Sequence, residues 1–246
     1  MLGSERQGQI LEYLKKNQTV SVKKLTETLY ISEATARRDL NELCKTGLVK
    51  RVYGGAQLAV SADRQVPLFV RERENEGAKS KLCREAAELV SDGDVLFIDG
   101  SSTAQVLVKY LYKFRDITVI TTGLKIAEML GKMHIKTYCT GGRLREDSSV
   151  FVGRDAERSA ARFNADICFI SCKGMDQNGR FTDTSEEETE LRQVFMQNSK
   201  KKVVLLTADK IGKSYLYTLC RSSEVDRIFT DGTLPDTVKT REEMPR

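Results

Sequence analysis

Apolar residues recur every three or four positions through the first 45 residues, the spacing that one face of a helix requires. Helices are predicted over residues 5–16, 22–29 and 31–43. In the third stretch, Ala36, Leu40 and Leu43 form a single apolar stripe, and Ser32 is placed to cap the first turn. The chain is therefore expected to begin with three short amphipathic helices.

A hairpin is predicted directly after the third helix. Strong β-formers over residues 48–52 flank Lys50 and Arg51, and the glycines at 54–55 allow the chain to turn. Three helices followed by a basic hairpin are typical of a winged helix-turn-helix, in which the hairpin contacts the DNA backbone or the minor groove. The first domain is predicted over residues 1–58.

The pattern changes after this domain. Residues 59–78 contain Pro67 and a charged amphipathic run, which predicts a linker leading into a helix. Strands are then predicted at residues 95–98, 117–121, 135–139, 167–170, 203–206 and 227–230. Helices are predicted at residues 79–90, 103–114, 124–131, 155–163 and 185–199. Short strands separated by helices imply a mostly parallel sheet covered on both faces, so residues 79–246 are predicted to form an α/β domain.

Charge is distributed unevenly along the chain. Residues 1–60 hold ten Lys or Arg and six Asp or Glu, so they carry +4 of the formal net charge of +5. A basic first quarter indicates an anionic partner, most commonly nucleic acid. With 40% hydrophobic and 30% charged residues, the chain can build a core and remain soluble.

Cysteine spacing and the first residues argue against several other classes of protein. The six cysteines form no C-x-x-C pair and no Cys/His metal spacing, and Cys168 and Cys172 are expected to be buried thiols. The first residues lack the apolar stretch of a signal peptide, and no apolar run approaches the length of a membrane span. A cytoplasmic protein with no metal site and no membrane contact is expected.

The open face of the third helix has the chemistry of a helix that reads DNA. Small and hydroxyl residues at its start permit close approach to the major groove, and arginine forks onto guanine or pairs with phosphate. The residues predicted to contact DNA are Ser32, Thr35, Arg37, Arg38, Asn41, Lys50 and Arg51. The alternative is an ordinary amphipathic helix with a solvated basic face, and the basic hairpin that follows favours DNA.

Hydroxyl and glycine residues lie at the ends of three predicted strands, where ligands bind in α/β sheets. Residues 99–103, Asp-Gly-Ser-Ser-Thr, open a helix and suit a phosphate group through backbone N–H groups and hydroxyls. Thr121 ends the second strand, and Gly141, Gly142 and Arg143 follow the third, where the arginine can pair with phosphate. Simple capping of the helix explains the first loop equally well. None of these loops has the P-loop pattern, so nucleotide hydrolysis is not indicated.

The residues of the first domain also match a known pattern. Arg6, Ile10 and Leu14 are followed, after a gap of seventeen residues, by Ser-Glu-Ala-Thr-Ala-Arg-Arg-Asp-Leu at 32–40, and Gly-Gly-Ala at 54–56 closes the region. This spacing resembles the signature of the DeoR family of bacterial transcriptional regulators, and the combination is much more specific than either half. The resemblance implies a winged helix-turn-helix that binds operator DNA.

The resemblance extends to the second domain. DeoR-family sensor domains are similar to the ribose-5-phosphate isomerase and CoA-transferase fold and respond to phosphorylated sugars, and residues 99–103 resemble their phosphate loop. Lys173, Glu188 and Lys210 match later family positions, although acids that open the helix at 185–199 also complement its macrodipole. The residues predicted to contact the effector are Asp99, Gly100, Ser101, Ser102, Thr103, Thr121, Gly141, Gly142, Arg143, Lys173, Glu188 and Lys210.

Together these observations predict a sequence-specific DNA-binding regulator, most simply a repressor, of a carbohydrate-metabolism operon. The expected effector is a phosphorylated sugar, with no other cofactor, and the expected partners are double-stranded operator DNA and further copies of the chain in a homodimer or homotetramer. One alternative is a sugar-phosphate isomerase, but residues 173–179 lack the D-G-x-D-E run of ribose-5-phosphate isomerases, and no catalytic residue is predicted. Another is a winged helix that contacts only proteins, which the two exposed arginines disfavour.

Overall fold

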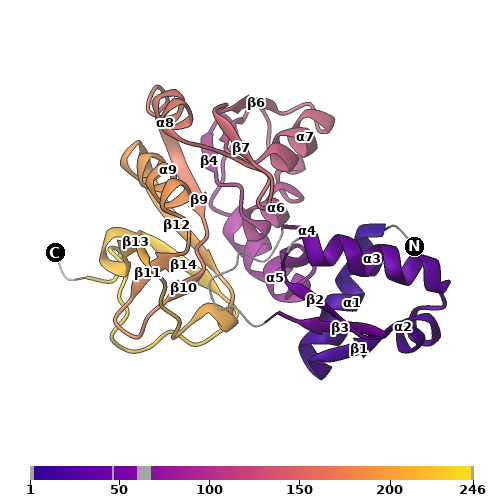
Figure 1. Cartoon of the computed structure of the whole chain (residues 1–246). Coiled ribbons are helices and arrows are strands. Elements are labelled where there is room, and N and C mark those ends of the chain that lie inside the picture. Colours follow the sequence, from indigo (N-terminus) through magenta and orange to yellow (C-terminus); the bar gives the residue numbers. More distant parts are fainter. Residues whose placement is uncertain (1–2, 46, 60–67, 245–246) are drawn as a thin grey trace. The chain divides into compact units, whose positions relative to one another are not determined.

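The chain folds into two compact units, residues 1–74 and 75–246 (Figure 1). The computed structural model describes residues 3–45, 47–59 and 68–244. The predicted linker at 59–78 falls partly on residues 60–67, which lie outside the described residues. Each unit has a hydrophobic core of its own. Within the described ranges, no helix combines the length and apolar character that crossing a membrane requires.

The described part of the first unit contains three main helices, a short fourth helix and a three-stranded sheet. Its elements are α1 (Gly3–Asn17), β1 (Thr19–Ser21), α2 (Val22–Leu29), α3 (Glu33–Lys45), β2 (Val49–Val52), β3 (Gly55–Leu58) and α4 (Leu68–Arg71). The sheet is antiparallel in the order β1-β3-β2. The three predicted helices and the hairpin are confirmed. Strand β1 was not predicted, because three residues are too few to show an alternating pattern.

The predicted apolar stripes form the core of this unit. Ile10 and Leu14 of α1, Leu25 of α2, and Leu40 and Leu43 of α3 are all buried in one cluster. Burying an aliphatic side chain of this size contributes about 1.5–3 kcal/mol relative to leaving it exposed, so these contacts fix α3 against the other two helices. The opposite face of α3 is left to solvent.

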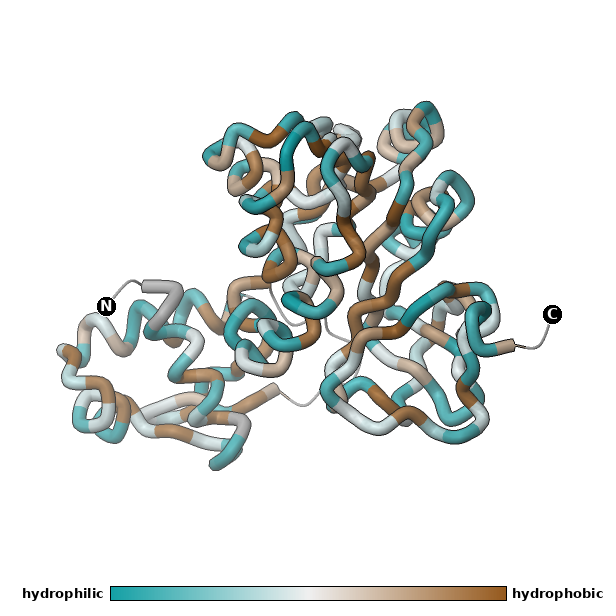
Figure 2. The backbone as a smooth tube through the Cα atoms, turned by 180° about the vertical axis from the view of Figure 1, so that it is seen from behind, coloured by the Kyte–Doolittle hydropathy of each residue, from teal (hydrophilic) through white to brown (hydrophobic). Residues whose placement is uncertain are grey.

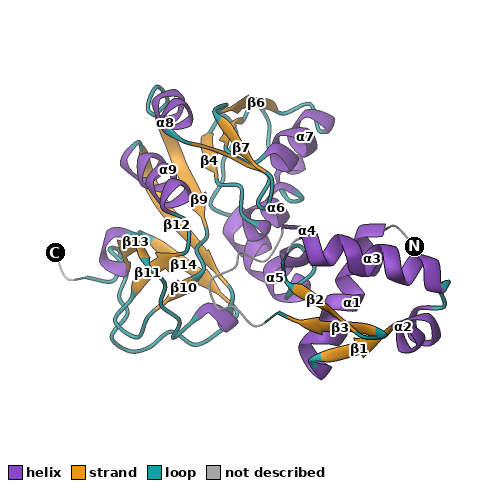
Figure 3. Ribbon diagram, viewed as in Figure 1, coloured by secondary structure: helices purple, strands orange, loops and turns teal. Residues whose placement is uncertain are grey.

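A six-stranded parallel sheet forms the centre of the second unit (Figure 3). In sheet order its strands are β14 (Arg227–Thr230), β12 (Ser199–Leu206), β9 (Ala165–Ile170), β4 (Val95–Ile98), β5 (Thr118–Thr121) and β6 (Lys136–Cys139). The helices around it are α5 (Glu76–Ala87), α6 (Ser102–Val108), η1 (Leu111–Lys113), α7 (Leu124–Lys132), α8 (Arg154–Ala160), α9 (Glu186–Gln197), η2 (Ala208–Lys210) and η3 (Ser222–Glu224). All six predicted strands and the predicted fold class are confirmed.

Helices cover both faces of this sheet, as predicted. Leu82 of α5, Leu107 of α6 and Leu130 of α7 are buried in one hydrophobic cluster, and Ala156 of α8 and Phe195 of α9 belong to the other. Figure 2 shows hydrophobic stretches along the strands and hydrophilic residues on the outer turns of the helices. Strands buried on both faces are continuously apolar, which is why they were visible in the sequence.

The structure differs from the prediction in its shorter elements. The predicted helix at 103–114 is α6 followed by η1, because the chain turns after Val108 to bury Leu111. Five short strands were not predicted: β7 (Arg143–Arg145), β8 (Val150–Val152), β10 (Gly174–Met175), β11 (Arg180–Asp183) and β13 (Tyr217–Arg221). β7 pairs with β8, and β10, β11 and β13 form a small antiparallel sheet.

Candidate functional site

The N-terminus of α3 is capped by its own hydroxyl residues. The Oγ of Ser32 accepts a hydrogen bond from the Thr35 N–H at 3.2 Å, which confirms the predicted cap. The two hydroxyl groups also lie 2.9 Å apart. These contacts define where α3 begins and leave small side chains at the end that would enter a groove.

Three predicted DNA-contacting residues lie on the exposed face of α3. Arg37, Arg38 and Asn41 are all exposed. Arg37 pairs with Glu33 one turn earlier, at 3.2 Å, but both side chains are more than half exposed, so this pair is weak. Arg38 forms no ion pair with the described part of the chain and is the stronger candidate for a base contact.

A buried ion pair fixes the inner face of α3. The Asp39 carboxylate accepts hydrogen bonds from Nε and Nη2 of Arg6 on α1, the second at 3.0 Å. The Asp39 side chain is only 3% exposed, and its hydrogen bond raises the pKa of Arg6 above the ordinary value. Both residues belong to the sequence signature, but the sequence did not show that they form a pair.

The hairpin carries its two bases on opposite faces. Lys50 and Arg51 are adjacent on β2 and both are exposed. Successive side chains of a strand point to opposite faces, so the two cannot make equivalent contacts. Arg51 faces Cys44 of α3, where burial raises the pKa of the thiol and the arginine partly opposes that shift.

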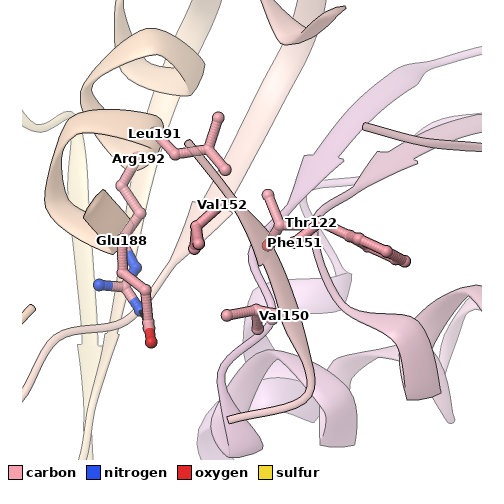
Figure 4. Close-up of a pocket in the computed structure, with 8 residues that line it drawn as sticks. Thr122, Val150, Phe151, Val152, Glu188, Leu191 and Arg192 are labelled. Atoms are coloured by element: carbon pink, nitrogen blue, oxygen red, sulfur yellow. Dashed lines mark hydrogen bonds and ion pairs between the residues drawn. The ribbon is translucent and has the colours of Figure 1, made fainter. Parts of the chain in front are cut away.

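A small cavity in the second unit opens among β8, α9 and the loop that follows β5 (Figure 4). Its volume is about 10 Å³, which is room for about one water molecule. The residues lining it include Gly100, Thr122, Val150, Glu188 and Arg192. Figure 4 shows Glu188 and Arg192 reaching from α9 toward the β8 side of the cavity. Of the predicted effector residues, the structure brings Gly100 and Glu188 to its wall.

Arg192 holds three carboxylates beside this cavity. Its Nε donates to Asp99 at 2.7 Å, its Nη1 to Asp183 at 3.0 Å and its Nη2 to Glu188 at 2.9 Å. Burial alone would lower the pKa of Arg192, but the charges of the three carboxylates outweigh burial and raise it. Arg192 and Asp183 were missed in the sequence. The only signal was the spacing of Glu188 and Arg192, which places them on one helical face.

Asp99 has a positioning role in this arrangement. Besides Arg192, it accepts hydrogen bonds from the Ser101 and Ser171 N–H groups, both at 3.1 Å. Ser101 in turn caps α6, since its Oγ accepts from the Ala104 N–H at 3.0 Å. The polar groups of Asp99 and Ser101 are therefore used within the protein, as the simple capping interpretation expected.

Two of the predicted glycine positions are sterically required. A Cβ on Gly100 would lie 2.0 Å from the Val150 side chain. Gly141 and Gly142 have φ of +68° and +99°, and a Cβ on Gly142 would lie 2.7 Å from the Val152 carbonyl oxygen. Both glycine loops therefore pack closely on β8, which places them next to the cavity.

Two other predicted residues lie away from the cavity wall. Thr121 is buried, and its Oγ1 accepts a hydrogen bond from the Gly123 N–H at 3.0 Å. Arg143 is 63% exposed and pairs with Glu187 at 2.6 Å.

Neither of the two predicted lysines lines the cavity. Lys210 Nζ donates to the Ser171 Oγ at 2.9 Å, which connects it through the Ser171 backbone to Asp99. The Lys173 N–H donates to the Thr182 carbonyl oxygen at the start of the small antiparallel sheet. Its side chain is half-buried.

The remaining two residues of the 99–103 loop contact α5. The Lys79 Nζ donates to the Ser102 Oγ at 3.2 Å, and the Cys83 thiol donates to the Thr103 carbonyl oxygen at 3.2 Å. Lys79 is 3% exposed and was missed in the sequence. Its position on the apolar face of α5, one turn before Cys83, was the available signal.

Two buried polar atoms near the loops have no hydrogen-bond partner among the described residues. They are the Glu188 Oε1, which lies 3.8 Å from the Arg145 Nη1, and the Thr103 Oγ1. A buried acceptor without a donor is unfavourable by about 1–3 kcal/mol, so the Glu188 oxygen at the cavity wall is suited to a ligand hydroxyl. In the described part of the chain, no group of three His, Cys, Asp or Glu side chains is placed to hold a metal ion.

Comparison with known proteins gives matches along both units. Residues 6–62 match the DeoR-like helix-turn-helix domain, and residues 74–232 match the DeoR C terminal sensor domain. The HTH-type transcriptional regulator GolR of Listeria innocua is 33% identical over 95% of this chain and 92% of its own. The glycerol-3-phosphate regulon repressor of Escherichia coli is 27% identical over 97% and 94%. Among solved structures, ribose 5-phosphate isomerase A of Methanocaldococcus jannaschii matches 56% of this chain and 55% of its own, with 18% identity and a TM-score of 0.43.

Proposed function

The chain belongs to the DeoR family of transcriptional regulators, and we propose that it represses a carbohydrate operon and releases operator DNA when it binds a phosphorylated sugar. The observation that carries the proposal is the exposed arginine pair on a capped helix α3, in a chain whose other unit matches a sensor domain. Two winged domains in a homodimer or homotetramer would reach operator half-sites about one helical turn, or a multiple of it, apart. Sedimentation of the protein with and without its operator distinguishes the two assemblies.

DNA recognition is assigned to the exposed face of α3 and to the hairpin. Arg38 and Asn41 are proposed to contact base edges, Arg37 a phosphate, and Ser32 and Thr35 the backbone near the start of the helix. Lys50 and Arg51 are proposed to extend the contact from the hairpin.

Replacing Arg38 with alanine is expected to weaken operator binding by about 1–3 kcal/mol, or about 5- to 150-fold in Kd, if the guanidinium is bidentate to a base. A duplex selected by the wild-type protein from a randomised pool serves as the operator, and fluorescence anisotropy at fixed salt gives the Kd. Arg158→Ala is the control, because Arg158 is an exposed arginine of the sensor unit. Unchanged affinity of Arg38→Ala would remove this residue from the interface.

The effector site is assigned to the cavity beside β8 and α9. The Glu188 Oε1 is proposed to accept a hydrogen bond from a sugar hydroxyl, and the adjacent 99–103 loop is proposed to hold the phosphate. Lys173 and Lys210 are proposed to supply positive charge to the ligand. A cavity of about 10 Å³ is far smaller than the roughly 300–1,000 Å³ of most ligand pockets, so binding requires the loops around it to open. The Escherichia coli relative is named for glycerol 3-phosphate, which supports a phosphorylated ligand.

A cognate sugar phosphate at about a hundred times its Kd is expected to stabilise the sensor unit by about 2.7 kcal/mol. For a unit of this size that is roughly 5–10 °C in Tm. Differential scanning fluorimetry with glycerol 3-phosphate, ribose 5-phosphate, fructose 6-phosphate and fructose 1,6-bisphosphate measures the shift, with inorganic phosphate and the free sugars as controls. If no compound of the panel shifts Tm, the effector assignment is wrong. Interconversion of any of these phosphates by the protein would instead support the isomerase.

A further inference from the structure

Helix α5 is attached to two loops that carry proposed effector residues. Asn75, which directly precedes α5, donates from its Nδ2 to the Asp209 Oδ1 at 2.7 Å. Asp209 is the neighbour of Lys210 in η2. One turn into α5, the Lys79 Nζ contacts the Ser102 Oγ of the 99–103 loop. The same short segment therefore contacts both η2 and the 99–103 loop.

This segment is also the covalent start of the sensor unit. The first unit ends at Glu74 and the second begins at Asn75. A change in the position or order of the first turn of α5 therefore reaches the DNA-binding unit through consecutive peptide bonds. No direct contact between the two units is required for this transmission.

We propose that the Asn75–Asp209 hydrogen bond, together with the Lys79–Ser102 contact, couples the effector pocket to the DNA-binding unit. The proposal rests on the proposed function. Phosphate at the 99–103 loop competes with Ser102 for the Lys79 ammonium, and effector contact with Lys210 shifts η2 and Asp209. Both changes act on the first turn of α5. Because coupling is reciprocal, operator DNA weakens effector binding by the same factor by which effector weakens DNA binding.

The backbone conformation at Asn75, where the second unit begins, favours asparagine. Asn75 has φ +55° and ψ +35°, a left-handed conformation that asparagine and aspartate tolerate better than most residues. The hydrogen bond to Asp209 fixes the orientation of the Asn75 side chain at this turn. Asn75→Asp keeps the size and the backbone preference, removes the donor and places two carboxylates against each other. It therefore removes the contact without a steric change.

The test is a swap of the two side chains. The operator Kd is measured without effector and then with one sugar phosphate, the compound of the four-member panel that gives the largest response in the wild-type protein. The ratio of these two Kd values measures the coupling. Asn75→Asp is expected to reduce this ratio about fivefold, the value of one hydrogen bond, while the effector-free operator Kd stays unchanged. The double variant Asn75→Asp/Asp209→Asn recreates an amide–carboxylate hydrogen bond in the opposite direction and is expected to restore the ratio.

A second pair of variants tests the Lys79 contact. Lys79→Met is expected to raise the Kd for the same sugar phosphate about tenfold, whereas Lys81→Met on the exposed face of α5 leaves it unchanged. Thermal unfolding of each variant shows whether it is folded. If the effector changes the operator Kd of the wild-type protein and Asn75→Asp gives the same ratio, the coupling proposal is wrong while the proposed function stands. The coupling proposal is also wrong if the double variant stays as impaired as Asn75→Asp. A wild-type ratio of one for all four compounds overturns both the coupling and the proposed function.

Discussion

Replacing Arg192 with methionine is expected to lower the free energy of unfolding of the sensor unit by about 3–5 kcal/mol. The guanidinium is 7% exposed and is shared by three carboxylates, Asp99, Asp183 and Glu188, whose side chains are 1%, 2% and 9% exposed. Without the arginine, Asp99 and Asp183 lose the cation that is hydrogen-bonded to them, and Glu188 keeps only Arg145 at 3.8 Å. Methionine replaces only the volume of the arginine side chain. The same change frees Asp99 from α9, so affinity for the sugar phosphate should fall as well.

Chemical denaturation measures the decrease in the free energy of unfolding of Arg192→Met. Arg158→Met, which replaces an exposed arginine, is the control. A loss below about 1 kcal/mol at pH 7, comparable to an exposed pair, would show that the cluster does not depend on Arg192.

The hydrophobic pattern of the sequence predicted the fold best where that pattern depends on a single helix or strand. The strands β4, β5 and β9 and the second half of β12 (residues 203–206) are largely buried and contain the apolar runs that predicted them. In α3, one stripe of small and branched residues faces the core, so the exposed position of Arg38 followed directly from helical spacing. These features depend on neighbours within one turn or one strand.

The candidate site could be predicted only in part, because its defining contacts join distant segments. The Nε of Arg192 and the carboxylate of Asp99 are 93 residues apart, and no local spacing identifies such a pair. The cavity wall includes β8, a three-residue strand too short to be recognised. Gly100 and Gly142 are predicted as loop residues of the site. The structure shows that both positions require glycine because a Cβ there would clash with that same strand. Residue types suggested the loops, and only the fold shows what they pack against.

The signature residues of the first domain illustrate the same limit. Arg6 and Asp39 belong to the sequence signature, and the sequence predicts an apolar stripe of Ala36, Leu40 and Leu43 on the inner face of α3. The structure shows that a buried ion pair occupies part of that face and joins α1 to the helix proposed to read DNA. Fixed residue types in a signature therefore reflect a contact that positions α3, as well as the residues that touch DNA.

Replacing Asp39 with alanine is accordingly expected to destabilise the DNA-binding unit by about 3 kcal/mol, at the lower end of the range for a broken buried pair because Arg6 is 16% exposed. Glu42→Ala is the matched control, an exposed acid of α3 paired with Lys45, and should change stability by less than about 1 kcal/mol.

The double variant Arg6→Met/Asp39→Leu separates stability from positioning. Because well-packed apolar groups can replace a buried ion pair, it should recover most of the lost stability. If the pair also sets the orientation of α3, operator affinity measured on the folded double variant stays below that of the wild-type protein. Full recovery of both stability and affinity would show that any contact filling this space positions α3 equally well.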